Sequence, residues 1–246
     1  MTTENSTETV LIRLRDLRDQ SERRYMHTES GFLNEEEQAA ARREFPEGGL
    51  IRYEGGYPGA LKKKVIFLRD EEDDLCDIVC LRAMTDQRFK NISHRDVLGA
   101  LMHLQIDRKS FGDFWVEEDR IYLYTSAQMG RFLCDNLLRI SSLNVSFEVI
   151  DEHPEQVFKT KKIKAVIASE RADAVVAALA HCSRSEAKQM IRQGRVQLNH
   201  VTLVNADEVC DNNVTISIRG TGRFTYLGVT GRTRKDRITV EFLQSI

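Results

Sequence analysis

The chain has 246 residues, of which 41% are hydrophobic, and its formal net charge at pH 7 is −2. These values are typical of a globular protein of one to three domains, and they exclude a disordered chain. No apolar run approaches the roughly 20 residues that span a bilayer, and the polar N-terminal residues lack the pattern of a secretory signal. We therefore expect a cytoplasmic protein that does not associate with membranes.

The first 75 residues are predicted to form an N-terminal helical and β subdomain. Their apolar residues change from a helical spacing to a strand-like one, with Gly and Pro between the segments. The predicted elements are helices over 10–28 and 32–45 and strands over 50–57 and 63–70.

A ferredoxin-like (RRM-like) domain is predicted for residues 76–152. Six segments follow one another in the order β-α-β-β-α-β, which is the split βαβ topology. They are 77–84, 93–106 with Ser93 as the helix cap, 113–118, 119–125, 127–140 and 144–150. Both helices would cover one face of the sheet, so we expect the other face to be free.

Four aromatic residues lie on the predicted strands of this domain: Phe114, Trp115, Tyr122 and Tyr124. RNA-recognition modules with this topology stack bases on strand aromatics, but the four residues do not match the motif of those modules. We therefore favour packing over base stacking for them.

Positive charge is concentrated at the C-terminal end of the chain. From Lys159 onward there are 15 Lys and Arg against 8 Asp and Glu, a net +7, whereas the first 158 residues have 21 against 30, a net −9. Such asymmetry is typical of a nucleic-acid-binding appendage on an acidic body. The predicted elements of this part are a strand running into a helix over 163–171, helices over 172–182 and 184–193, and strands over 196–199, 214–218, 223–230 and 236–243.

The segment from Ser183 to His200 combines helix signals with a row of cations. Ser183 and Glu186 form a capping-box pattern, and Gly194 ends the predicted helix. Arg and Lys recur every three or four residues and so stay close together on the helix surface, where guanidinium groups can bind phosphate oxygens in pairs. The cations are Arg184, Lys188, Arg192 and Arg195, with Gln189 and Asn199 as interleaved hydrogen-bonding groups.

Two further basic clusters follow, and their glycines permit close approach of a ligand to the backbone. Taken with the cationic helix, they favour RNA binding over a merely solvated surface. The clusters contain Arg219 and Arg223, and then Arg232, Arg234, Lys235 and Arg237.

The stretch ERADAVVAALAHCSRSEAKQMIRQGRVQLNHVTL resembles the RNA-binding domain named after the fourth small-subunit ribosomal protein, the S-four domain. That domain has the pattern R-L-D, a helix, S-R-x-x-A, I-x-x-G and V-x-V-N-G. Matching residues begin with Arg171 and Asp173 and end with Val196 and Asn199, while His200 replaces the usual glycine. Asn and His tolerate positive φ, so we expect the turn to be kept.

Beyond this domain, GGYPGALKKKVIF, SHRDVLGALMHLQIDRKSFGDFWV and RGTGRFTYLGVTGRTRKDRITV resemble the bacterial YlmH-like family. The resemblance implies a ferredoxin-like middle RNA-binding domain and an S-four domain over residues 165–246. It also implies no catalytic activity, and association with rRNA and tRNA of large ribosomal subunits that carry an obstructing peptidyl-tRNA. Some family members have been labelled cell-division proteins.

The predicted protein is thus an α+β monomer: an N-terminal α/β extension, a ferredoxin-like middle domain and a C-terminal αL-type S-four domain. The five cysteines lack paired C-x-x-C spacing and no phosphate-loop motif is present, so we expect neither a metal nor a cofactor. The predicted RNA-binding residues are Arg171, Ser183, Arg184, Lys188, Gln189, Arg192, Arg195, Asn199, Arg219, Arg223, Arg232, Arg234, Lys235 and Arg237.

Two alternatives remain open from the sequence. One is an RNA-modifying enzyme whose only candidate groups are Asp96 and Asp113, although each is more simply explained as a cap or loop residue. The other is an interaction adaptor, linked to cell division, that binds a protein through the free face of the middle sheet.

Overall fold

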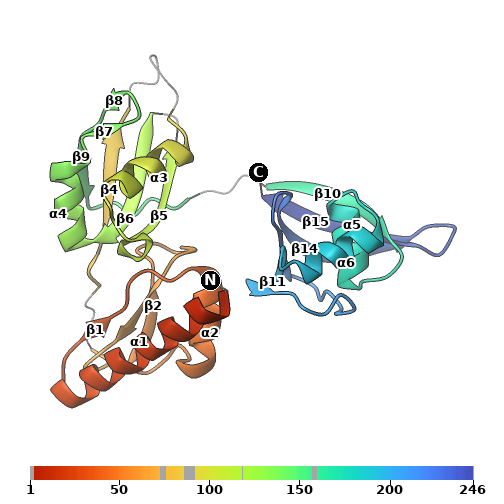
Figure 1. Ribbon diagram of the computed structural model, residues 1–246, viewed down its shortest axis with the longest axis horizontal. Helices are drawn as coiled ribbons and strands as arrows, with labels where there is room; N and C mark the ends of the chain where they lie inside the picture. The colour runs from red at the N-terminus through yellow and green to blue at the C-terminus, as the bar shows by residue number, and fades with distance from the viewer. Residues whose placement is uncertain (1–2, 73–75, 86–91, 118, 157–159, 246) are drawn as a thin grey trace. The chain divides into compact units, whose positions relative to one another are not determined.

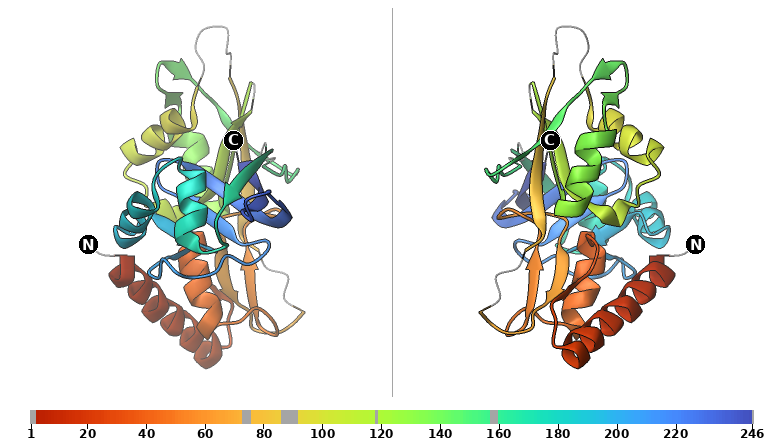
Figure 2. Two further views of the ribbon diagram at one scale, coloured as in Figure 1. Left: turned by 90° about the vertical axis from the view of Figure 1, so that its right-hand side faces the viewer. Right: turned by 90° about the vertical axis from the view of Figure 1, so that its left-hand side faces the viewer.

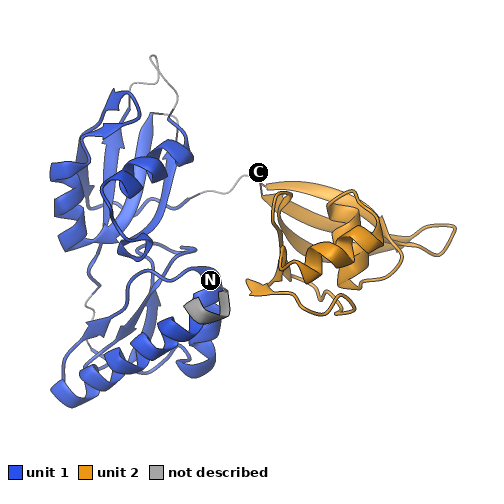
Figure 3. Ribbon diagram, in the orientation of Figure 1, with its two compact units in different colours: residues 1–156 blue, residues 157–246 orange. Residues whose placement is uncertain are grey.

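The computed structural model describes residues 3–72, 76–85, 92–117, 119–156 and 160–245. The chain divides into two compact units, residues 1–156 and 157–246 (Figure 3). Among the described helices, none combines the length and the apolar character that a bilayer span requires.

The N-terminal part of unit 1 packs two helices against a small antiparallel sheet with the strand order β1-β3-β2. Val10, Leu14 and Leu17 form an apolar stripe on the first helix and are buried against the second helix and the sheet. The elements are α1 (Thr3–Arg24), β1 (Thr28–Glu29), α2 (Glu35–Glu44), β2 (Ile51–Glu54) and β3 (Lys64–Phe67).

Both N-terminal helices differ from their predicted bounds. α1 ends four residues early because Tyr25 adopts a positive φ of 48°. α2 starts three residues late, after a capping box between Asn34 and Glu37. The backbone N–H groups of Phe32 and Leu33 do not enter the helix, since they donate to the carbonyl oxygens of Lys109 and Lys63.

The second part of unit 1 is a four-stranded antiparallel sheet with the order β5-β6-β4-β9 (Figures 1 and 2). Its elements keep the predicted β-α-β-β-α-β order, and a two-stranded hairpin is inserted before the last strand. They are β4 (Ile78–Met84), α3 (His94–His103), the 3₁₀ turn η1 (Arg108–Ser110), β5 (Phe111–Glu117), β6 (Arg120–Ser126), α4 (Ala127–Asn136), β7 (Arg139–Ile140), β8 (Leu143–Asn144) and β9 (Phe147–Ile150).

Helices α3 and α4 cover one face of this sheet. Val97 and Leu101 from α3 and Leu133 from α4 are fully buried against strand residues such as Leu81 and Leu123. α4 was predicted to reach residue 140 but ends at Asn136, because the chain then turns to bury Leu137 and Ile140 in the same core and to form β7.

The prediction that the other face of the sheet is free is wrong for much of that face. Trp115, Tyr122 and Tyr124 are 7%, 6% and 0% exposed and pack with Tyr57, which comes from the N-terminal part of the unit. The rings of Tyr57 and Tyr124 have centroids 4.9 Å apart, and the Tyr124 hydroxyl donates to the Pro154 carbonyl at 2.8 Å. These aromatic side chains therefore pack within the protein, which agrees with the prediction that favoured packing over base stacking.

Unit 2 is a six-stranded antiparallel sheet with two helices packed on it (Figure 1). Val175 and Val176 of the first helix and Ala187 and Ile191 of the second share a core with the strands, including Phe242. The strands lie in the sheet in the order β10-β15-β14-β13-β11-β12. In chain order, the elements of the unit are β10 (Thr160–Ile167), α5 (Ala172–Leu179), α6 (Arg184–Arg192), β11 (Val196–Leu198), β12 (Val201–Thr202), β13 (Thr215–Ile218), β14 (Gly222–Arg232) and β15 (Ile238–Ser245).

The turns of unit 2 explain its departures from the predicted pattern. α5 stops at Leu179 rather than at residue 182 because His181 has φ 52°. Asn199 and His200 both adopt the left-handed conformation, with φ 46° and 66°, as expected for residues that tolerate it. The tight turn between β11 and β12 is thus kept without the usual glycine.

Candidate RNA-binding surface

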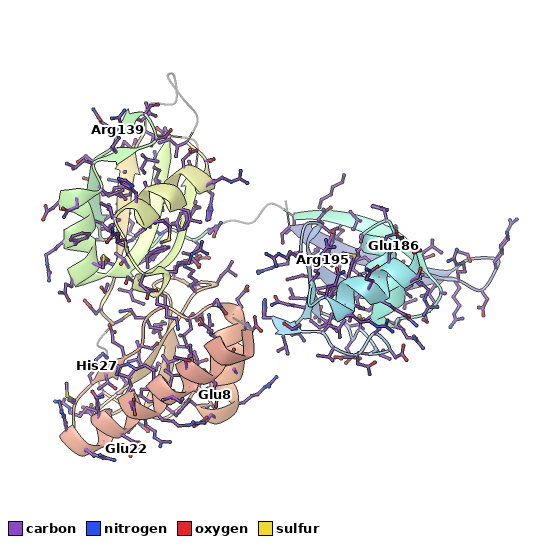
Figure 4. The ribbon with its side chains drawn as sticks, in the orientation of Figure 1. Glu8, Glu22, His27, Arg139, Glu186 and Arg195 are labelled. Atoms are coloured by element: carbon purple, nitrogen blue, oxygen red, sulfur yellow. The ribbon has the colours of Figure 1, made fainter. Side chains whose placement is uncertain are left out.

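Helix α6 is fixed at both ends by its own sequence. The Ser183 N–H donates to the Glu186 carboxylate at 2.8 Å, and the Glu186 N–H donates to the Ser183 hydroxyl at 3.3 Å. The Ser183 hydroxyl also donates to the Glu186 carboxylate at 2.7 Å. This bond, together with the one from the Ser183 N–H, lowers the pKa of Glu186. At the other end, Gly194 has φ 65°, and the Arg195 N–H reaches back to the Met190 carbonyl at 3.0 Å. Ser183, predicted as an RNA contact, is thus engaged in capping; Figure 4 labels Glu186 and Arg195 near the two ends of the helix.

A buried carboxylate organises three of the predicted RNA-binding cations. Asp173 on α5 has no exposed side-chain surface, and both of its oxygens accept from Arg184 Nη2 at 2.8 Å. Arg171 donates to the same carboxylate at 3.3 Å, and Lys188 Nζ lies 3.5 Å away. Burial works against ionisation, but the hydrogen bonds from Arg184 and Arg171 hold the pKa of Asp173 below its usual range.

This cluster, hereafter the Asp173 cluster, keeps positive charge at the surface. Arg184 and Lys188 side chains are 48% and 42% exposed, so one carboxylate orients them without removing them from solvent. Arg171 also pairs with the exposed Asp207. Three cations against two carboxylates leave a net +1. The sequence placed Asp173 in a matched motif but not among the functional residues, because its partners lie up to 15 residues away along the chain.

A second group of predicted residues meets where α6 ends. Arg195 Nη2 donates to the Arg219 carbonyl at 3.1 Å, and the Arg219 N–H donates to the Arg195 carbonyl at 2.8 Å. Asn199 accepts from the Thr215 N–H at 2.9 Å and so holds the turn rather than presenting its carbonyl outward. Gln189 and Arg192 are exposed on α6.

The remaining predicted cations lie on the β14–β15 hairpin. Arg223 is half-buried on β14, and the hairpin loop carries the exposed Arg234, Lys235 and Arg237. Arg232 pairs with Asp236 at 2.8 Å, which leaves the loop with a smaller net charge than the sequence suggests.

Arg237, at the base of this hairpin, lies close to the start of α6. It lines a cavity of about 210 Å³ together with Arg184 and with apolar residues that include Val166, Ala177 and Cys182. The structure therefore brings the first residue of α6 and the base of the hairpin to one place on unit 2.

The two carboxylates considered for catalysis both have structural partners. Asp96 completes the capping box of α3, accepting from the Ser93 N–H at 2.9 Å. Asp113 is buried and accepts from the Tyr57 hydroxyl at 2.8 Å and from the N–H groups of Leu61 and Lys62 at 2.6 and 3.2 Å. Burial raises the pKa of Asp113. No group of three or more His, Cys, Asp or Glu residues within the described ranges is placed to hold a metal ion.

Comparison with known proteins identifies both RNA-associated parts of the chain. The family described as "Putative RNA-binding domain in YlmH" matches residues 71–155, and the S4 domain family matches residues 170–211. The Bacillus subtilis (strain 168) protein named ribosome-associated protein quality control protein P2 is 28% identical over 204 residues, which cover 78% of this chain and 77% of that protein. A solved structure, the cell division protein ylmH from Streptococcus pneumoniae, is 20% identical to this chain and matches it with a TM-score of 0.49. The match covers 61% of this chain and 93% of the Streptococcus pneumoniae chain. The two matched domains, in this order along the chain, make it a YlmH-like protein with a C-terminal S4 domain.

Proposed function

We propose that this protein binds ribosomal RNA through helix α6 and the two basic loops of its S4 domain. The observation that carries the proposal is the Asp173 cluster, in which a buried carboxylate fixes Arg184 at 2.8 Å while the guanidinium stays half exposed. Fixed, exposed guanidinium groups suit phosphate oxygens, because little side-chain entropy is lost when they bind. Arg192 and Arg195 would extend the contact along the helix, and Arg219, Arg223 and the hairpin cations would flank it.

We further propose that the RNA belongs to large ribosomal subunits stalled with peptidyl-tRNA, so that tRNA is a second partner. This proposal is supported by the similarity to a protein named for ribosome-associated quality control. Under this proposal the protein acts in the cytoplasm. In this account, the protein acts as a monomer and needs no cofactor.

The middle domain is proposed to be ferredoxin-like and to contribute to RNA binding. The strand order β5-β6-β4-β9 and the two helices on one face support the fold, and the matched family supports RNA binding. We propose a binding role without catalysis, because Asp96 and Asp113 are each engaged by hydrogen bonds that cap a helix or hold a loop.

Sedimentation with separated ribosomal subunits tests the proposed partner. The purified protein is mixed with small or large bacterial subunits, with and without bound peptidyl-tRNA, and layered on a sucrose gradient. We expect it to travel with large subunits and to be enriched on those carrying peptidyl-tRNA. Equal recovery with both subunits, or recovery only at the top of the gradient, would contradict the proposal.

A further inference from the structure

The sheet of the middle domain has two faces, and RNA bases cannot reach the aromatic side chains on the face opposite the helices. Trp115, Tyr122 and Tyr124 lie on the face opposite the helices and are at least 93% buried. A Cβ atom added to Gly56 would lie 2.5 Å from the Tyr124 ring, so the segment that contains Gly56 is in direct contact with this face. Base stacking on these aromatics, the usual mode for a sheet of this topology, would require that segment to leave.

We propose that the middle domain instead binds RNA backbone in the groove between α3 and the segment 136–141, which runs from the end of α4 to just beyond β7. The proposal rests on the proposed function of the whole chain and assigns the site within this domain. The groove has a volume of about 610 Å³ and is lined by Arg95, Gly99 and His103 of α3, by Asn136 at the end of α4, by Arg139 of β7 and by Ser141 directly after β7. Figure 4 labels Arg139 in this part of unit 1.

The charges of the groove suit a phosphate ligand. Arg95 and Arg139 are exposed, one on each side, and neither forms an ion pair with any residue in the described part of the chain. The single lining carboxylate, Asp96, accepts hydrogen bonds from the N–H and hydroxyl of Ser93. Two guanidinium groups on opposite sides of a groove can bind the oxygens of a phosphate.

Gly99 provides an independent observation. It lies inside α3, where glycine costs about 1 kcal/mol relative to alanine. A Cβ atom at this position would meet nothing within 4 Å, so packing within the protein does not require the glycine. Gly130 in α4 differs, because a Cβ atom there would lie 2.9 Å from Val79. A glycine that faces open space in a basic groove permits close approach of a ligand backbone.

The test uses the full-length chain and large-subunit rRNA transcribed in vitro, with binding measured over a salt series. Gly99→Leu fills the groove, and Arg95→Ala plus Arg139→Ala removes its cations. The matched control is Arg108→Ala plus Arg131→Ala, which removes two exposed arginines of the same unit that do not line the groove. Gly99→Ala controls for the helix, since alanine is a better helix former than glycine.

We expect Gly99→Leu and the groove double variant to weaken binding roughly tenfold, and the double variant to lower the salt slope by about one to two units. Gly99→Ala and the control should bind as the unchanged protein does, and thermal melting should show that all variants are folded. If both groove variants bind normally while Arg184→Ala plus Arg192→Ala loses affinity, the groove proposal is overturned and the proposed function stands. If all of these variants bind normally, both proposals fail.

Discussion

Arg184 Nη2 lies 2.8 Å from both carboxylate oxygens of Asp173, a side chain without exposed surface. The pair joins the first residue of α6 to the first turn of α5. Asp173 therefore acts as a positioning residue: it sets the direction of an exposed guanidinium without contacting the proposed ligand.

Replacing Asp173 separates positioning from net charge. Asp173→Asn removes a negative charge from the cluster and so raises its net charge by one, and charge alone therefore predicts tighter RNA binding. We expect weaker binding, by about 1 kcal/mol or roughly fivefold in Kd, because Arg184 and Lys188 lose their fixed orientation. Asp207→Asn is the control, since it makes the same charge change at an exposed carboxylate that contacts only Arg171 in this cluster. Equal effects of the two substitutions would refute the positioning role.

The stability of unit 2 should depend on pH through Asp173. The pKa of Asp173 is lowered in the folded state. The ionised carboxylate therefore makes its full contribution to stability at pH values above the pKa of Asp in the unfolded chain, which is about 3.9. This contribution is lost as the pH falls below that value and through the lower folded pKa. Denaturation followed by far-UV circular dichroism at successive pH values should show a loss of unit 2 stability in this range. We expect Asp173→Asn to be less stable than the unchanged protein at neutral pH and to lose less stability as the pH falls into this range. An equal loss of stability in the two proteins would count against the ion pair.

Asp113 is predicted to be a structural residue. Asp113→Ala leaves the Tyr57 hydroxyl and two backbone N–H groups without their acceptor, at a cost of about 2–4 kcal/mol in the stability of unit 1. Trp115 is the single tryptophan of the chain, and its ring centroid lies 5.7 Å from that of Tyr57, so its fluorescence reports on this contact.

We expect the emission of Asp113→Ala to shift to longer wavelength and its unfolding midpoint to fall. RNA recovered after incubation with the unchanged protein should show no change in mass. A mass change that Asp113→Ala abolishes would instead support the enzyme alternative.

The turn at Asn199 and His200 gives a local test of backbone strain. His200 has φ 66°, which a β-branched side chain adopts only with strain. We expect His200→Gly to change the free energy of unfolding by less than about 1 kcal/mol, and His200→Val to cost about 1–2 kcal/mol more. Urea denaturation of the two variants measures the difference; similar stabilities would mean that the turn relaxes.

Local signals in the sequence were sufficient for much of the fold. The predicted caps at Ser93 and Ser183 each depend on a partner three residues away, and both are present. Helix ends set by a positive φ at Tyr25 and His181 could not be predicted in this way, because Tyr rarely adopts that conformation and His tolerates it without requiring it.

Contacts between distant residues could not be predicted from the same signals. Tyr57 packs on Tyr124, 67 positions away, and covers a sheet face that strand alternation alone left free. The candidate site shows the same limit: helical spacing brought Arg184 and Lys188 together, but their shared partner Asp173 lies on another helix.

The central claim, that α6 binds RNA, is tested most directly by the salt dependence of binding for Arg184→Ala plus Arg192→Ala. Large-subunit rRNA is titrated over a salt series with this variant, the unchanged protein and a control, Arg13→Ala plus Arg24→Ala, which removes two exposed arginines from α1. Each lost phosphate contact lowers the slope of log K against log salt by about 0.7–0.9. We predict a slope lower by about one to two units and weaker binding for the α6 variant, with no change for the control; unchanged affinity and slope in a folded α6 variant would contradict the claim.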